Sequence, residues 1–162
     1  MENENLDFAL TLMGGALMQR QQADTLLACN EITAARGLVL TQQSALALVE
    51  TRSETLKKTG RIELGAGIVD KLIMAFYDSP YISQENYEEI LHELIDLFYS
   101  FKNDTHDCIS DDALIDYMKK AFNDGCRGSL ELLAGEALPA LARKINERCA
   151  ADPFENMEIT DD

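Results

Sequence analysis

The chain has 162 residues, of which 46% are hydrophobic and 27% are charged, the balance of a folded protein with a buried core. Its formal net charge of −15 excludes a nucleic-acid-binding surface, because such a surface needs clustered Lys and Arg to displace phosphate counterions. The same charge disfavours an anionic membrane surface and fits either a solvated exterior or a basic partner.

The sequence also lacks the segments that direct a chain into or across a membrane. No run of about 18 apolar residues is present, so no membrane span is predicted. The first residues, MENENLDF, are acidic, whereas a secretory signal starts with positive charge. We therefore expect a cytoplasmic protein.

Four cysteines, at positions 29, 108, 126 and 149, form no CxxC pair. Because a reducing cytosol keeps such residues reduced, the sequence predicts four free thiols. A zinc site built from His106, Cys108 and Cys126 would have a spacing that matches no short ligand pattern, so no metal site is predicted.

The first predicted element is a helix over residues 6–18. Gly14 and Gly15 interrupt it, and each costs about 1 kcal/mol relative to Ala in a helix interior, but together they offer a flat surface to another helix. Residues 19–24, which are polar apart from Ala23, separate it from the rest, so residues 1–19 are predicted to be a detachable N-terminal helix. Its apolar face consists of Leu6, Leu10, Met13 and Leu17.

Six further helices are predicted in chain order. They span residues 21–36, 41–58, 66–78, 83–103, 110–123 and 129–149. The first of these ends at Gly37, which can take the left-handed turn after a helix. Thr41, Ser83 and Ser110 each follow an apolar residue and are predicted to cap helix N-termini. Pro139 predicts a kink or break near residues 135–139.

The stretch 83–102 carries the bulkiest apolar stripe of the chain, so the other helices are expected to pack around it. That stripe consists of Tyr87, Ile90, Leu91, Leu94, Phe98 and Phe101. The predicted fold is an all-α, single-domain, irregular or orthogonal bundle of six to seven helices. Residues 20–149 form this helical domain, and residues 150–162 are predicted to be an acidic disordered tail.

No set of residues in the sequence forms a recognisable catalytic or metal site. Glu89 and His92 have the Glu-x-x-His spacing of half a di-metal site, but the second copy is absent. Helical geometry directs both of them toward water, away from the apolar stripe. His106 and Asp107 precede Cys108 directly, a spacing that rarely gives catalytic geometry, so no catalytic residue and no cofactor are predicted.

Residues 60–67 have the glycine spacing of a phosphate-binding loop, but Ala66 and Gly67 stand where that loop needs Lys and Ser or Thr. The remaining feature is a glycine-rich helix start, whose free N–H groups could bind a small anion. The residues proposed for this ligand site are Arg61, Gly65, Gly67, Arg52 and Tyr81. Glu63 opposes anion binding there, and the alternative is that the glycines let one helix approach another.

Several short runs together resemble a family of small bacterial proteins that is classed as a domain of unknown function. The runs are Leu26–Glu31, Gly37–Leu38, Thr59–Arg61, Asp78–Ile82, Phe101–Asn103, Phe122–Asn123 and Gly128–Leu130. The resemblance covers about residues 20–148. It implies a cytoplasmic bacterial protein and supplies no activity, cofactor or catalytic residue.

Two functions follow as hypotheses. The first is a non-enzymatic protein–protein interaction, either with another protein or in a homodimer formed through residues 6–18. The alternative is a protein that binds a small ligand or anion at Arg61 and the helix start at Gly65 and Gly67. The absence of a convergent catalytic set in the sequence favours the first.

Overall fold

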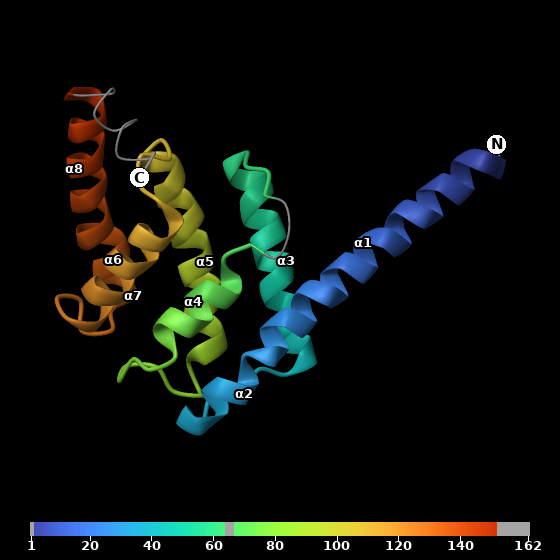
Figure 1. Cartoon of the computed structure of the whole chain (residues 1–162), viewed down its shortest axis with the longest axis horizontal. Helices are drawn as coiled ribbons and strands as arrows, with labels where there is room; N and C mark the ends of the chain where they lie inside the picture. The colour runs from blue at the N-terminus through green and yellow to red at the C-terminus, as the bar shows by residue number, and fades with distance from the viewer. Residues whose placement is uncertain (1, 64–66, 152–162) are drawn as a thin grey trace.

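The computed structural model describes residues 2–63 and 67–151, with side chains from residue 13 onward. The described residues form helices and no strand, as an all-α, single-domain irregular bundle (Figure 1), which confirms the predicted fold class. The elements are α1 (Glu2–Ala28), α2 (Asn30–Thr33), a 3-10 turn (Ala34–Arg36), α3 (Gln42–Thr59), α4 (Val69–Phe76), α5 (Tyr87–Asp104), α6 (Asp111–Asn123), α7 (Leu130–Leu132), a π-helical turn (Leu133–Ala137) and α8 (Leu138–Ala151). The tail predicted over residues 150–162 lies outside the described residues from residue 152 onward.

Helix α1 is continuous across both places where the sequence predicts an interruption. Its 27 residues include Gly14, Gly15 and the polar stretch 19–24. The predicted break between a helix at 6–18 and another at 21–36 is therefore wrong. The physical reason is that each glycine weakens a helix by only about 1 kcal/mol, while neighbouring Ala, Leu, Met, Gln and Arg all favour it.

Only the C-terminal part of α1 belongs to the packed bundle. Ala23 and Leu26 are buried and α1 contacts α3 there, whereas residues 13–21 are all exposed. Figure 1 shows the N-terminal part of α1 running away from the other helices. The chain therefore has a packed body and one projecting helix.

Helix α5 is the centre of that body, as the sequence predicts. It contacts α3, α4, α6 and α8. Its buried residues are Tyr87, Ile90, Leu91, Leu94, Ile95, Phe98, Tyr99 and Lys102. Burying aromatic and branched side chains of this size stabilises a core by about 1.5–3 kcal/mol each relative to exposure.

Two of the three predicted N-caps are confirmed. The hydroxyls of Thr41 and Ser110 accept hydrogen bonds from the backbone N–H groups of Ser44 and Ala113. Ser83 is not a cap, because α5 begins at Tyr87. The side chain of Asn86 instead accepts from the Ser83 N–H and donates to the Tyr81 carbonyl, which closes a turn before the helix.

The predicted kink before Pro139 is a π-helical turn. The backbone N–H of Leu138 donates to the carbonyl of Leu133, five residues earlier. Proline has no N–H to donate to the carbonyl of Gly135, and its ring crowds that carbonyl in a regular α-helix. The wider turn accommodates both effects, and α8 continues beyond it.

The prediction of four free thiols is wrong for two of them. Cys108, in the loop after α5, forms a disulfide with Cys149 near the end of α8, across a Cα–Cα distance of 6.5 Å. The two residues are 41 positions apart in sequence, and they meet because α8 packs back against α5. Cys29 and Cys126 are free.

Candidate functional site

Arg52, one of the residues predicted to bind an anion, lies in a buried cluster with its own carboxylate. Its side chain is 4% exposed, and its Nη2 lies 3.0 Å from Oε1 of Glu63. The hydroxyl of Tyr99 donates to the same oxygen at 2.8 Å. Burial opposes the charge on Arg52, but hydrogen bonds with Tyr99 and Glu63 outweigh it and raise the pKa of the guanidinium. The cluster joins α3 and α5 to the loop that precedes α4.

Gly67 covers this cluster with bare backbone. Its φ of +77° lies in the left-handed region, and a Cβ built on it would collide with the Arg52 guanidinium and with Oε1 of Glu63. Gly67 therefore allows the backbone of this loop to pack closely over the two side chains. Gly65 lies outside the described residues, so its part in the predicted anion site stays a prediction.

Arg61 lies beside a different carboxylate. Its guanidinium forms two hydrogen bonds to Asp107, of 2.7 and 3.1 Å, and a third to Oδ1 of Asn103 at 2.7 Å. These hydrogen bonds to Arg61 hold the pKa of Asp107 below its usual range. The pair connects the loop after α3 to the loop after α5.

Tyr81 lies apart from the arginines. Its ring packs edge-on against Phe122, with centroids 6.2 Å apart, and against Gly128, where a Cβ would collide with it. The structure thus brings Arg52 and Gly67 together, places Arg61 on Asp107, and puts Tyr81 beside α6. Whether any anion binds at these residues stays a prediction.

His92 differs from its prediction, whereas Glu89 matches it. Glu89 is exposed, but His92 is half-buried between α5 and α3. Its Nδ1 lies 2.6 Å from Oγ1 of Thr51, and its Nε2 lies 3.4 Å from Oε1 of Glu88. Helical spacing shows that His92 lies away from the apolar stripe of α5. It does not reveal that α3 packs against the side of α5 that carries His92.

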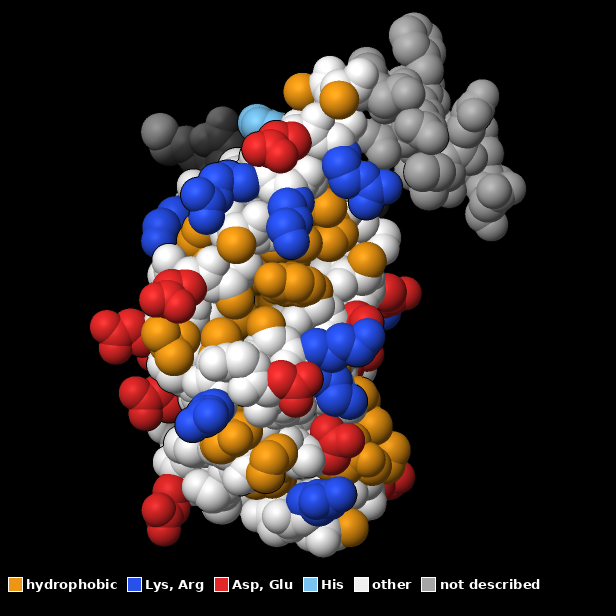
Figure 2. Space-filling view, turned by 90° about the vertical axis from the view of Figure 1, so that its left-hand side faces the viewer, with side chains coloured by type: hydrophobic (Ala, Val, Ile, Leu, Met, Phe, Trp, Pro, Cys, Tyr) orange, Lys and Arg blue, Asp and Glu red, His pale blue; other side chains and the backbone are white. Residues whose placement is uncertain are grey.

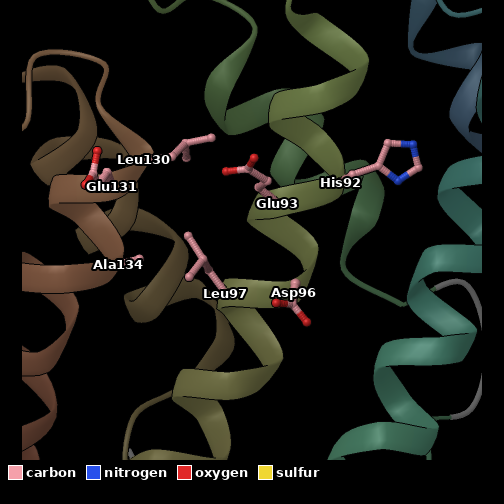
Figure 3. A pocket seen from close by; sticks show the side chains of 7 residues that line it. All are labelled: His92, Glu93, Asp96, Leu97, Leu130, Glu131 and Ala134. Atoms are coloured by element: carbon pink, nitrogen blue, oxygen red, sulfur yellow. The ribbon is translucent and has the colours of Figure 1, made fainter.

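A groove of about 420 Å³ lies between α5 and α7. Glu93, Asp96 and Glu131 lie around it together with apolar side chains, while His92 points away from it toward α3 (Figure 3). Lys58 approaches Asp96 at 3.9 Å, a surface pair of small energetic value. Among the described residues, no group of His, Cys, Asp and Glu is placed to hold a metal ion.

A second groove, of about 560 Å³, lies between α6 and the π-helical turn. The hydroxyl of Tyr117 donates to the carbonyl of Ala137 at 3.1 Å on its wall. Cys126 is buried beside it, and burial followed by the charge of Glu136 raises the pKa of that thiol. A thiol with a raised pKa stays protonated near neutral pH, so this cysteine has no activated nucleophile character.

Figure 2 shows the face on the α8 side, where Lys and Arg side chains surround apolar ones. Residues 119–151, which include α8, hold more basic than acidic side chains, unlike the chain as a whole. They include Lys119, Lys120, Arg127, Arg143, Lys144 and Arg148 against Asp124, Glu131, Glu136 and Glu147. The acidic character of the chain therefore comes from other segments, and this face has a mixed charge.

The projecting part of α1 carries the most exposed large apolar side chains of the described helices. Met13 is 62% exposed, and Leu17 and Met18 are each 58% exposed. Nothing lies within 4 Å of a Cβ built on Gly14 or Gly15. None of the described helices combines the length and the apolarity needed to cross a bilayer.

Sequence reasoning missed the residues that pair with the predicted ones. The sequence presents Glu63 only as an obstacle to anions, because its pairing with Arg52, 11 positions earlier, has no local signal. Asp107 and Tyr99 gave no local signal, because their partners are 46 and 47 positions away in the chain.

Comparison with known proteins agrees with the resemblance seen in the sequence. No curated protein and no solved structure shows a significant similarity to the chain. A family model described as a family of unknown function, DUF6323, matches residues 25–151. The match includes the packed body and leaves the first 24 residues of the chain, with most of α1, outside it. The chain therefore belongs to the family of unknown function DUF6323.

Proposed function

We propose that the protein is a non-enzymatic helical module that associates with a second copy of itself through α1. The observation that carries this proposal is the exposure of Met13 and Leu17, which share one face of a helix that projects from the body. Large apolar side chains grouped on one exposed element are typical of an interaction surface.

The energetics of an isolated helix support the need for a partner. In proteins, most of the stability of a helix comes from tertiary packing of its apolar face rather than from helix propensity. The projecting part of α1 also contains Gly14 and Gly15, which together cost about 2 kcal/mol relative to Ala. A second helix against its apolar face supplies the packing that the body does not.

The spacing of the apolar residues fits a two-stranded seam. Positions 6, 10, 13 and 17 alternate steps of four and three, the pattern of a coiled-coil interface. In an antiparallel pair with its two-fold axis beside residues 11 and 12, Leu6 lies opposite the second copy's Leu17, and Leu10 lies opposite its Met13. All four positions then pair with one another, so the contact closes after two copies.

Charge favours the same antiparallel arrangement over a parallel one. In this register Arg20 of one copy lies near Glu2 and Glu4 of the other. A parallel pair would place the two acidic ends together and the two Arg20 side chains together. Opposite charges across such a seam help to set orientation, while their contribution to affinity is small.

Light scattering after size exclusion tests the proposal directly. We expect the full chain to be a dimer, and Leu17→Asp to be a monomer with an unchanged helical body. Met18→Asp is the matched control, because Met18 is equally exposed but lies about 110° from the centre of the seam. A monomeric full chain at high concentration, or a dimeric Leu17→Asp variant, would overturn the proposal.

Small-anion binding at Arg61 stays the alternative function. An anion there has to displace Asp107, whose hydrogen bonds to Arg61 are already formed. A phosphate at 100 times its dissociation constant would stabilise the fold by about 2.7 kcal/mol. A thermal-shift titration with phosphate measures this, and a shift that persists in Arg61→Ala would contradict the assigned site.

A further inference from the structure

We propose that the disulfide between Cys108 and Cys149 is a redox lock for the C-terminal half of α8, and that its reduction by a dithiol releases that half from the bundle. The lock involves residues far from α1 in the sequence, and it does not depend on the proposed self-association. It concerns which surface the body of the molecule presents under oxidising and reducing conditions.

The burial pattern along α8 shows where the lock acts. Leu138 and Ala142 are its buried residues, and beyond Ala142 no described side chain of the helix is buried. The side chain of Asn146 donates a hydrogen bond of 2.9 Å to the carbonyl of Asp104. The disulfide at Cys149 follows within one turn of that bond. The last two turns of α8 thus depend on the covalent link far more than on apolar packing.

The loop that receives Cys149 is fixed by contacts of its own. Lys102 is 5% exposed, and its Nζ donates to the carbonyl of Ile109 at 2.6 Å and lies 2.9 Å from Oδ1 of Asp111. Asp107, in the left-handed region at φ 58°, is held by Arg61. These contacts remain when the disulfide opens, so the loop stays in place and α8 is the side that moves.

The disulfide is open to the reductant. Cys108 is exposed and Cys149 is half-buried, and accessible disulfides of this kind exchange with attacking thiolates. One thiolate of the dithiol attacks one sulfur and releases the other as a thiolate, which takes up a proton. The second thiolate of the dithiol then displaces the protein sulfur from the mixed disulfide. The protein gains two electrons and two protons, and the dithiol becomes a disulfide.

Release changes the charged face described above. The freed turns carry Arg143, Lys144 and Arg148, which form half of the basic residues between positions 119 and 151. In the oxidised chain the helical segment that carries these side chains is held to the loop after α5 by the disulfide at Cys149. In the reduced chain they are carried on a segment that frays, so the mixed-charge face is intact only while the disulfide is closed.

Hydrogen–deuterium exchange on the full chain tests the lock. Reduction with dithiothreitol should lower amide protection in residues 143–151 by about tenfold or more beyond any loss in residues 87–104 of α5. The double variant Cys108→Ser/Cys149→Ser should show the reduced pattern without reductant and respond to none. The variant Cys29→Ser/Cys126→Ser is the matched control and should respond as the wild type does.

Three results would overturn the proposal. The first is a chain purified without reductant whose mass and alkylation show four free thiols. The second is unchanged protection of residues 143–151 after confirmed reduction. The third is an equal loss of protection in α5, which would make the disulfide a staple of the whole fold. None of these results bears on whether Leu17→Asp alters the oligomeric state.

Discussion

Helices α1 and α5 are both long, and the molecule uses them in opposite ways. Helix α5 has 18 residues and its bulky side chains are buried against four neighbouring helices. Helix α1 has 27 residues, yet its large side chains between residues 13 and 18 are exposed. The comparison teaches that the chain itself covers the apolar side chains of α5, whereas it leaves those in the projecting part of α1 exposed.

The largest contrast is expected from matched truncations in the two helices. Phe98 is 1% exposed in the core, so Phe98→Ala should lower the free energy of unfolding by about 3–5 kcal/mol. Leu17→Ala, at concentrations where the chain is monomeric, should change it by less than about 0.5 kcal/mol. Urea denaturation followed by circular dichroism measures both. A comparable loss in the two variants would break the distinction between the helices.

The disulfide extends the comparison to the other end of the chain. Because it closes a loop of 41 residues, the chain-entropy model gives it a contribution of several kcal/mol, and about 2–4 kcal/mol is typical. Cys108→Ser/Cys149→Ser should lower the free energy of unfolding by that amount under non-reducing conditions. Denaturation of the wild type with reductant should give the same value. A variant as stable as the oxidised wild type would contradict the covalent contribution.

The buried arginine cluster tests how tightly α5 is joined to its neighbours. Gly67→Ala adds a methyl group that collides with Arg52 at a backbone position with positive φ, so a loss of about 2–3 kcal/mol is expected. Gly60→Ala is the matched control. It has a similar φ of +69° but open space around its Cβ, so it should cost about 1 kcal/mol. Thermal unfolding of both variants measures the difference, and equal losses would remove the Arg52 contact as its cause.

The smallest expected effect is a pH dependence at the start of α5. Burial raises the pKa of Tyr87 to about 12 from an ordinary value of 10. Because the unfolded chain loses this proton first, the stabilisation is complete below pH 10 and is lost as the pH rises toward 12. Denaturation at several alkaline pH values should show a steeper loss for the wild type than for Tyr87→Phe. Parallel curves would show that Tyr87 ionises as readily as an exposed phenol.

The sequence predicts well the features that depend on neighbours along the chain. The α5 stripe follows from helical spacing, and the caps at Thr41 and Ser110 follow from residue type next to an apolar run. Gly37 ends its helical turn with a φ of +77°, as glycine after a helix predicts. Pro139 marks the π-helical turn because the missing N–H is a property of that residue alone.

Features that depend on residues far apart in the sequence cannot be predicted from the pattern of neighbouring residues. The pairs Arg61–Asp107 and Cys108–Cys149 join residues more than 40 positions apart, and the sequence holds other residues of each type that could be the partner. The prediction from neighbouring residues was also wrong at Ser83. Ser83 could cap a helix, but the Asn86 side chain accepts from its N–H and closes a turn before the helix begins. In the candidate site, the single sequence pattern of glycines and arginines proved compatible with internal packing as well as with a ligand.

The π-helical turn before Pro139 also sets the rotational phase of everything that follows it. A π-helical turn contains about one residue more than an α-helical turn, so it shifts each later side chain around the helix axis by about 100° relative to a regular helix. Cys149 meets Cys108 in this phase. If the same residues formed a regular α-helix through this turn, Cys149 would be rotated by that angle and directed away from its partner. The irregular turn thereby determines which pair of cysteines can join.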